Sequence, residues 1–154
     1  MNILWGNPHA TDAEIMEAIK IAQAAEIVAD KEGGLDFMIE QGGKNLSGGQ
    51  RQRLGIARTL VANPEILIFD DSASALDYAT DARLRGALRE MKGEHTLFII
   101  SQRAASILHA DKILVLDDGK LVGVGKHEEL LRTSEVYQEI YYSQFPKEKE
   151  AETV

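Results

Sequence analysis

The stretch Asn45–Leu54 constrains the fold of this chain more than any other, because a helix has to begin inside it. Ser47 is a preferred N-cap residue, and apolar residues at helical spacing follow it as far as Val61. Gly48 and Gly49 leave the first free backbone N–H groups of this helix uncovered by side chains. Such donors, at the positive end of the helix dipole, favour an anion, most often phosphate. The stretch therefore predicts a phosphate site, and the alternative is an ordinary capped helix that two glycines happen to precede.

The segment after this helix predicts a buried strand that ends on two carboxylates. Asn63 and Pro64 close the helix, because proline cannot continue it. The run Ile66–Phe69 has no polar alternation, which is typical of a strand buried on both faces of a parallel sheet. Asp70 and Asp71 follow directly, at the edge where open α/β sheets bind ligands. A carboxylate in this place commonly holds Mg²⁺ beside a nucleotide.

Together these segments resemble the nucleotide-binding domain of ABC transporters, over nearly the whole chain from Asn2 to Gln144. The family's signature motif is matched without a change by Leu46, Ser47, Gly48, Gly49 and Gln50. Ile66–Asp70 is similar to the Walker B strand, and the D-loop is matched by Ser74, Ala75, Leu76 and Asp77. The segment Gly123–Leu130 is similar to the closing segment of exporter-type members.

This resemblance implies the fold class and the cofactors. It implies an α/β fold, the C-terminal part of a P-loop NTPase domain, with a mostly parallel sheet, flanking helices and an α-helical signature subdomain. We expect residues 1–62 to form that subdomain, residues 63–145 to form the RecA-like part with the Walker B strand, D-loop and H-loop, and residues 146–154 to form a mobile tail. The implied reaction is hydrolysis of ATP to ADP and phosphate, with Mg²⁺ held by Asp70.

The resemblance also implies partners. In ABC dimers the signature motif caps the ATP that the opposite subunit holds, so Ser47 and the amides of Gly48 and Gly49 would complete the partner's site. Ser74 and Asp77 would lie at the dimer seam. The helical subdomain would face the transmembrane domain of a transporter, at the cytoplasmic face of the plasma (inner) membrane. Nucleic acid is not an expected partner, because 17 basic residues against 25 acidic ones give a net charge of −8.

One motif of the family is missing from this sequence, the phosphate-binding loop G-x-x-x-x-G-K-[ST]. Lys44 and Lys126 each follow a glycine, but Met38 and Lys120 stand where the earlier glycine is needed. In the family this loop, the adenine-stacking aromatic residue and the Q-loop all precede the segment that Asn2–Gly6 resembles. We therefore expect the C-terminal part of a nucleotide-binding domain, either an expressed fragment or a truncated gene product. Alone it should show no significant ATP hydrolysis, weak nucleotide affinity and self-association through uncovered sheet surfaces.

Two catalytic positions depart from the family's pattern. Asp71 stands where competent members have the glutamate that orients the attacking water, and a misplacement of about 1 Å can lower the rate about 10²-fold. Gln102 stands where the family has its switch histidine, and an amide can neither carry a positive charge nor shuttle a proton. We interpret the pair as the degenerate half of a heterodimeric exporter, and the alternative is neutral drift.

Three functional classes stay open. The first is the ATPase of an exporter. The second is a soluble ABC-type ATPase, as in DNA repair or translation, which the acidic charge, the absence of coiled-coil arms and the exporter-like ending disfavour. The third is a non-hydrolysing nucleotide-binding or regulatory subunit, which Asp71 and Gln102 support.

Local signals predict the remaining elements. A capping box at Thr11–Glu14 opens a helix, and Asp118 and Gly119 form a hairpin turn between strands at 112–116 and 121–124. We expect Trp5 to be a core anchor. Further helices are predicted at 24–30, 79–92, 104–109, 128–131 and 135–144, with a buried strand at 96–100 and core packing by Tyr137, Tyr141 and Tyr142.

Overall fold

The computed structural model describes residues 2–72, 75–91 and 95–146. The chain divides into two compact units, Met1–Phe98 and Ile99–Val154, and each is described by itself. The predictions for Ser74, for the helix end at 92 and for the tail beyond Pro146 concern residues outside these ranges. The predicted division into a helical subdomain, a RecA-like part and a tail stays a prediction.

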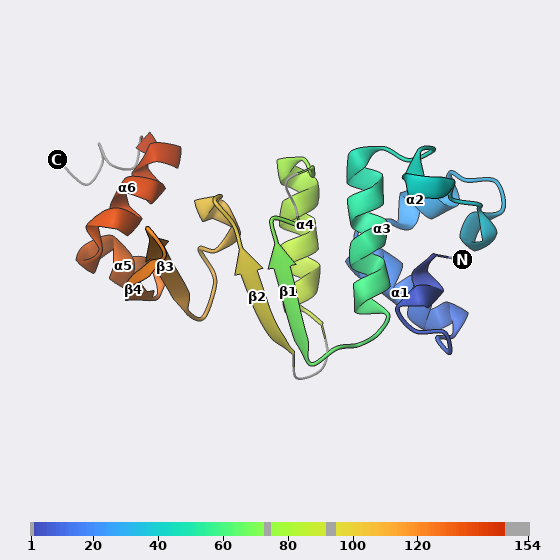
Figure 1. Cartoon of the computed structure of the whole chain (residues 1–154), viewed down its shortest axis with the longest axis horizontal. Coiled ribbons are helices and arrows are strands. Elements are labelled where there is room, and N and C mark those ends of the chain that lie inside the picture. The colour runs from blue at the N-terminus through green and yellow to red at the C-terminus, as the bar shows by residue number, and fades with distance from the viewer. Residues whose placement is uncertain (1, 73–74, 92–94, 147–154) are drawn as a thin grey trace. The chain divides into compact units, whose positions relative to one another are not determined.

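The first unit is mostly helical up to the strand that carries Asp70 (Figure 1). Its α-helices are α1 (Asp12–Ile21), α2 (Ala25–Ala29), α3 (Gly48–Leu60) and α4 (Tyr78–Arg89), and its strands are β1 (Ile66–Asp70) and the start of β2 (Thr96–Ile100). Single 3-10 turns cover Ile3–Trp5, Gly34–Asp36 and Gln41–Gly43. The predicted capping box of α1 is confirmed, because Thr11 and Glu14 hydrogen-bond reciprocally at its start.

One hydrophobic cluster holds the first unit together. Ile15 and Ile19 of α1 and Ala57 of α3 are almost completely buried in it. The same cluster includes Leu67 of β1 and Leu84 of α4, so the helices and the strand share one core. Burial of this kind, at about 25 cal/mol per Å² of apolar surface, is the main term that fixes α3 against its neighbours.

The prediction that the two strands are buried on both faces is wrong. Leu67 and Phe69 are buried, whereas Ile66 and Ile68 on the opposite face of β1 are 60% and 65% exposed. On β2, which pairs with β1 and points the same way (Figure 1), Ile100 is exposed as well. Within the first unit, helices pack on the Leu67 and Phe69 face of β1, and the Ile66 and Ile68 face is exposed. An apolar run indicates a strand, but it does not specify what lies on each face.

The second unit is a hairpin with two helices. Strands β3 (Ile113–Asp117) and β4 (Lys120–Gly125) pair antiparallel, and helices α5 (His127–Thr133) and α6 (Glu135–Gln144) follow. The predicted hairpin turn is confirmed: both of its residues have positive φ, 45° at Asp118 and 72° at Gly119, as a type I′ turn requires. A single 3-10 turn at Ala104–Ser106 replaces the longer helix predicted there.

The core of this unit combines aliphatic residues with buried tyrosines. Tyr137 and Tyr141 are buried as predicted, and the Tyr137 hydroxyl lies 2.9 Å from Nδ1 of His127. Trp5, in the first unit, contradicts the prediction, since it is 77% exposed while Ile3 of the same turn is buried. A turn of three residues directs its side chains to different sides: Ile3 and Leu4 pack against the core, and Trp5 points away from it.

No helix in the described part of the chain is both long and apolar enough to span a lipid bilayer.

Candidate functional site

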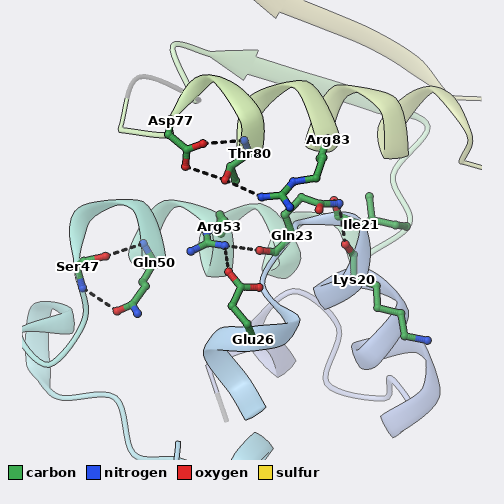
Figure 2. Close-up of polar contacts among 10 residues, drawn as sticks. All are labelled: Lys20, Ile21, Gln23, Glu26, Ser47, Gln50, Arg53, Asp77, Thr80 and Arg83. Atoms are coloured by element: carbon green, nitrogen blue, oxygen red, sulfur yellow. Dashed lines mark hydrogen bonds and ion pairs between the residues drawn. The ribbon is translucent and has the colours of Figure 1, made fainter. Parts of the chain in front are cut away.

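The predicted phosphate site lies at the N-terminus of α3, and Ser47 caps this helix as expected (Figure 2). The Ser47 Oγ accepts the Gln50 backbone N–H at 3.2 Å, and the Gln50 Oε1 accepts the Ser47 N–H at 2.9 Å. The Gly48 and Gly49 amides occupy the first two helical positions, where no intrahelical acceptor exists. The local geometry therefore presents two oriented N–H donors to an anion.

Arg51 fixes the loop that leads into this helix. Its Nη1 donates to the Gly43 carbonyl at 3.2 Å and to the Leu46 carbonyl at 2.7 Å. Gly43 has φ of +65°, and a Cβ there would lie 2.7 Å from the Arg51 Cδ, so the arginine occupies the space that a side chain would need. The guanidinium thus holds the turn directly before Ser47 in one conformation.

The predicted D-loop packs on the glycines of the signature motif. A Cβ on Gly49 would lie 3.1 Å from the Ala75 carbonyl oxygen, so a side chain there would push Ala75 back by a few tenths of an ångström. Leu76 is buried beside it. Ser74 lies outside the described residues, and Ala75, Leu76 and Asp77 are the part of the motif that the structure places.

Asp77 caps helix α4. Its carboxylate accepts the Thr80 backbone N–H at 3.0 Å and the Thr80 hydroxyl at 2.8 Å, and Arg83 donates to the same hydroxyl (Figure 2). These hydrogen bonds, the backbone one first, hold the pKa of Asp77 below its usual value of 3.8. Asp77 is therefore ionised at neutral pH and keeps the start of α4 in place.

The two carboxylates at the end of β1 are both exposed. Asp71 has φ of +47°, a left-handed conformation that aspartate adopts more readily than most residues. Among the described residues, no group of three or more acidic, histidine or cysteine side chains is arranged to hold a metal ion. Asp70 could supply one carboxylate to Mg²⁺, which beside a nucleotide takes one or two carboxylates and completes its shell with water and phosphate oxygens, and this assignment stays a prediction.

Gln52 joins these segments, and sequence reasoning missed it. Its Nε2 donates to the Asp71 backbone carbonyl at 3.4 Å, and its Oε1 accepts the Ala75 backbone N–H at 3.2 Å. A polar residue on the outer face of a predicted helix carries no signal of such a role. The structure thus brings the signature helix, the end of β1 and the described part of the D-loop together within the first unit.

Arg53 anchors the other side of α3. It donates to the Gln23 backbone carbonyl and forms an ion pair with Glu26 (Figure 2). Burial acts to raise the pKa of Glu26, but the hydrogen bond and charge of Arg53 outweigh it and lower the pKa. The arginine therefore ties α3 to the corner between α1 and α2.

Gln102, the predicted counterpart of the switch histidine, belongs to the second unit and is exposed. Its backbone carbonyl accepts a hydrogen bond from the Gln144 Nε2 at 2.8 Å, and the Gln144 Oε1 accepts the Ala104 N–H at 2.9 Å. The last residue of α6 therefore holds this turn by its backbone. No local sequence pattern indicates this contact, which joins segments about forty residues apart.

Comparison with known proteins decides the family. A protein family described as ABC transporter matches residues 6–74. An uncharacterized ABC transporter ATP-binding protein of Bacillus subtilis, YfiB, is 46% identical over 147 residues, which are 96% of this chain and 25% of that protein. The chain belongs to the ABC transporter ATP-binding family.

Other members agree in sequence and in structure. A putative multidrug export ATP-binding/permease protein of Staphylococcus aureus is 41% identical over 91% of this chain and 24% of its own length. The structure of a bacterial Atm1-family ABC exporter with ATP bound superposes with a TM-score of 0.87 at 40% sequence identity. The match covers 93% of this chain and 25% of the exporter chain. The P-loop NTPase fold of ABC ATPases is thus confirmed. This ABC chain spans about a quarter of the length of the relatives it matches.

Proposed function

We propose that this chain is part of the ATP-binding and ATP-hydrolysing subunit of an ABC exporter, which powers transport across a membrane. The observation that carries the proposal is the unaltered signature motif on a capped helix, with the Gly48 and Gly49 amides free to bind an anion. The names of the similar multidrug export protein and of the Atm1-family exporter support the exporter type. The transmembrane domain of the transporter and a second ABC ATPase subunit are the proposed partners, at the cytoplasmic face of the membrane.

The signature face acts on a nucleotide held by the second subunit. Ser47, Gly48 and Gly49 would donate hydrogen bonds to its terminal phosphate, and the helix dipole would add a favourable charge interaction. Ala75, which we assign to the D-loop, lies beside Gly49, and this proximity supports one surface for both motifs. Cofactors of the assembled protein would be ATP and Mg²⁺, which supply a hydrolysable phosphoanhydride and charge neutralisation.

In the chain's own site, we assign Asp70 to Mg²⁺ and Asp71 to orientation of the attacking water. Gln102 would hydrogen-bond the γ-phosphate. The shorter acid and the uncharged amide support a site that holds ATP with little turnover, in a heterodimer whose partner has a competent site. A non-hydrolysing regulatory subunit is the second candidate, and the same two residues favour it.

Ser47→Asp tests the signature contact in the complete protein that carries this sequence. Aspartate is as good an N-cap as serine and is favourable at a helix N-terminus, so the thermal stability should be unchanged or slightly higher. The added negative charge should repel the phosphate and abolish ATP-driven closure and transport. Ser47→Ala should lower stability by about 1 kcal/mol through loss of the cap and should weaken closure less. Normal transport by Ser47→Asp would refute the assignment.

The degenerate-site proposal has a separate test. Asp71→Glu combined with Gln102→His, introduced into the complete two-subunit protein, should raise ATP turnover by restoring the longer acid and the ionisable ring. Unchanged hydrolysis would mean that these residues do not limit the rate. Used alone, the chain described here should hydrolyse no ATP, and micromolar Mg-ATP binding in a titration would contradict the expected weak affinity.

A further inference from the structure

Gln52 lies in the second turn of α3. Its side chain links this helix to the residue after β1 and to the segment assigned to the D-loop. Its amide makes two backbone contacts, one to Asp71 and one to Ala75, 19 and 23 residues further along the chain. The partners fix the orientation of the amide, because the Asp71 carbonyl can only accept and the Ala75 N–H can only donate. Glutamate has no donor and lysine has no acceptor, so neither can replace both bonds.

Ala75 contacts α3 through one hydrogen bond and one close backbone approach. Its N–H donates to Gln52, and its carbonyl oxygen lies against the backbone of Gly49, 3.1 Å from the position that a Cβ would take there. Asp71, at φ of +47°, receives the other Gln52 bond at its carbonyl. The acid that follows β1 and the D-loop are therefore attached to the same turn and a half of one helix.

We propose that Gln52 is a positioning residue, which transmits a displacement of the signature helix to the backbone of Asp71 and Ala75. This rests on the proposed function, in which a partner's nucleotide binds at Ser47. Helix α3 is hydrogen-bonded along its length, so its N-terminus and Gln52, about 7.5 Å further along the axis, move together. A phosphate that draws the helix end toward itself then shifts the Asp71 backbone. Occupancy of the partner's site thereby adjusts the acid of this subunit's own site.

Amide hydrogen exchange on the chain as it stands tests the contact itself. Gln52→Ala should speed exchange of the Ala75 amide about fivefold, the factor expected for loss of one net hydrogen bond. Gln52→Glu keeps an acceptor for this amide and should preserve its protection, while it loses the donor to Asp71. Thr59→Ala is a matched control, because Thr59 bonds only within the same helix, to the Gly55 carbonyl, and it should leave Ala75 unchanged. Unchanged exchange in Gln52→Ala would overturn the proposal.

Steady-state hydrolysis by the complete protein then tests the coupling. In a complete protein whose second subunit has been made hydrolysis-deficient, the residual turnover comes from this chain's own site. There, Gln52→Ala should lower kcat about tenfold with the KM for Mg-ATP within about twofold, because it misplaces the acid without touching nucleotide. Gln52→Glu should not restore kcat, since the Asp71 bond stays broken, and Thr59→Ala should behave as wild type. A normal kcat in Gln52→Ala would overturn the coupling. A wild-type protein without ATPase activity would instead refute the proposed function, and the exchange experiment would still decide the contact.

Discussion

Gly6 gives the most quantitative prediction, because a side chain has no room there. A Cβ on this residue would lie 1.9 Å from the Arg58 carbonyl oxygen and 2.9 Å from the Val61 Cγ1. Cβ atoms essentially never approach other atoms closer than 3.0 Å, so Gly6→Ala requires the segment before α1 and the end of α3 to separate by about 1 Å. The Arg58 oxygen belongs to helix backbone and cannot rotate away, unlike the end of a flexible side chain.

We expect Gly6→Ala to lower the free energy of unfolding of the first unit by about 3 kcal/mol, the upper part of the range for overpacked sites. Urea titration followed by far-ultraviolet circular dichroism measures this, since the first unit holds most of the helices in the described chain. Fluorescence is a poor reporter, because Trp5 is already exposed.

Gly55→Ala is the matched control. Gly55 lies inside α3, and a Cβ there would meet nothing within 4 Å outside the helix's own backbone. Alanine should therefore stabilise the unit by up to about 1 kcal/mol through its higher helix propensity. If both substitutions shift stability equally, or if Gly6→Ala shifts it by less than about 1 kcal/mol, the inferred contact between Gly6 and α3 is wrong.

The remaining predictions concern ionisation and self-association. The hydrogen bonds from Thr80 lower the pKa of Asp77 in the folded protein. The stability that this cap contributes is therefore complete above about pH 4 and is lost as the pH falls through the lowered pKa. Asp77→Asn should flatten this part of an acid-unfolding curve. Burial raises the pKa of Tyr137 above 10.0, so the second unit should lose stability as the pH rises beyond 10, and Tyr137→Phe should reduce this loss in circular dichroism. The exposed apolar face of β1 should cause self-association, and Ile68→Lys should lower the average mass in sedimentation; a wild-type monomer at all concentrations would contradict this.

Features that depend on neighbours along the chain could be predicted from the sequence. The caps at Thr11 and Ser47 and the turn at Asp118 and Gly119 involve residues at most three positions apart, and the structure has all of them. Local residue types determine the partners in such contacts, because the donor and acceptor are close along the chain. The same locality explains why the signature motif could be placed on a helix N-terminus.

Features that depend on distant segments could not be predicted. The apolar run at Ile66–Phe69 indicates a strand, but it does not indicate that the face with Ile66 and Ile68 is exposed. Trp5 is apolar and yet exposed, whereas Ile3 and Leu4 of the same turn pack against the core. Gln52 contacts residues about twenty positions away, and nothing in its immediate sequence distinguishes it from a solvent-exposed helix residue. Long-range partners are set by the packed fold, which a local pattern does not specify.

The contacts of α3 explain why its N-terminus can act as a preorganised anion site. Gln52 and Arg53 are consecutive, so they point about 100° apart around the helix axis. One contacts the Asp71 and Ala75 backbone, and the other contacts the corner between α1 and α2. Anchors in two directions prevent rotation of the helix about its axis, and Gly6 packs against its far end. A phosphate therefore meets amides that are already oriented. Because the helix is ordered before the phosphate binds, no cost of ordering it is subtracted from the free energy of binding.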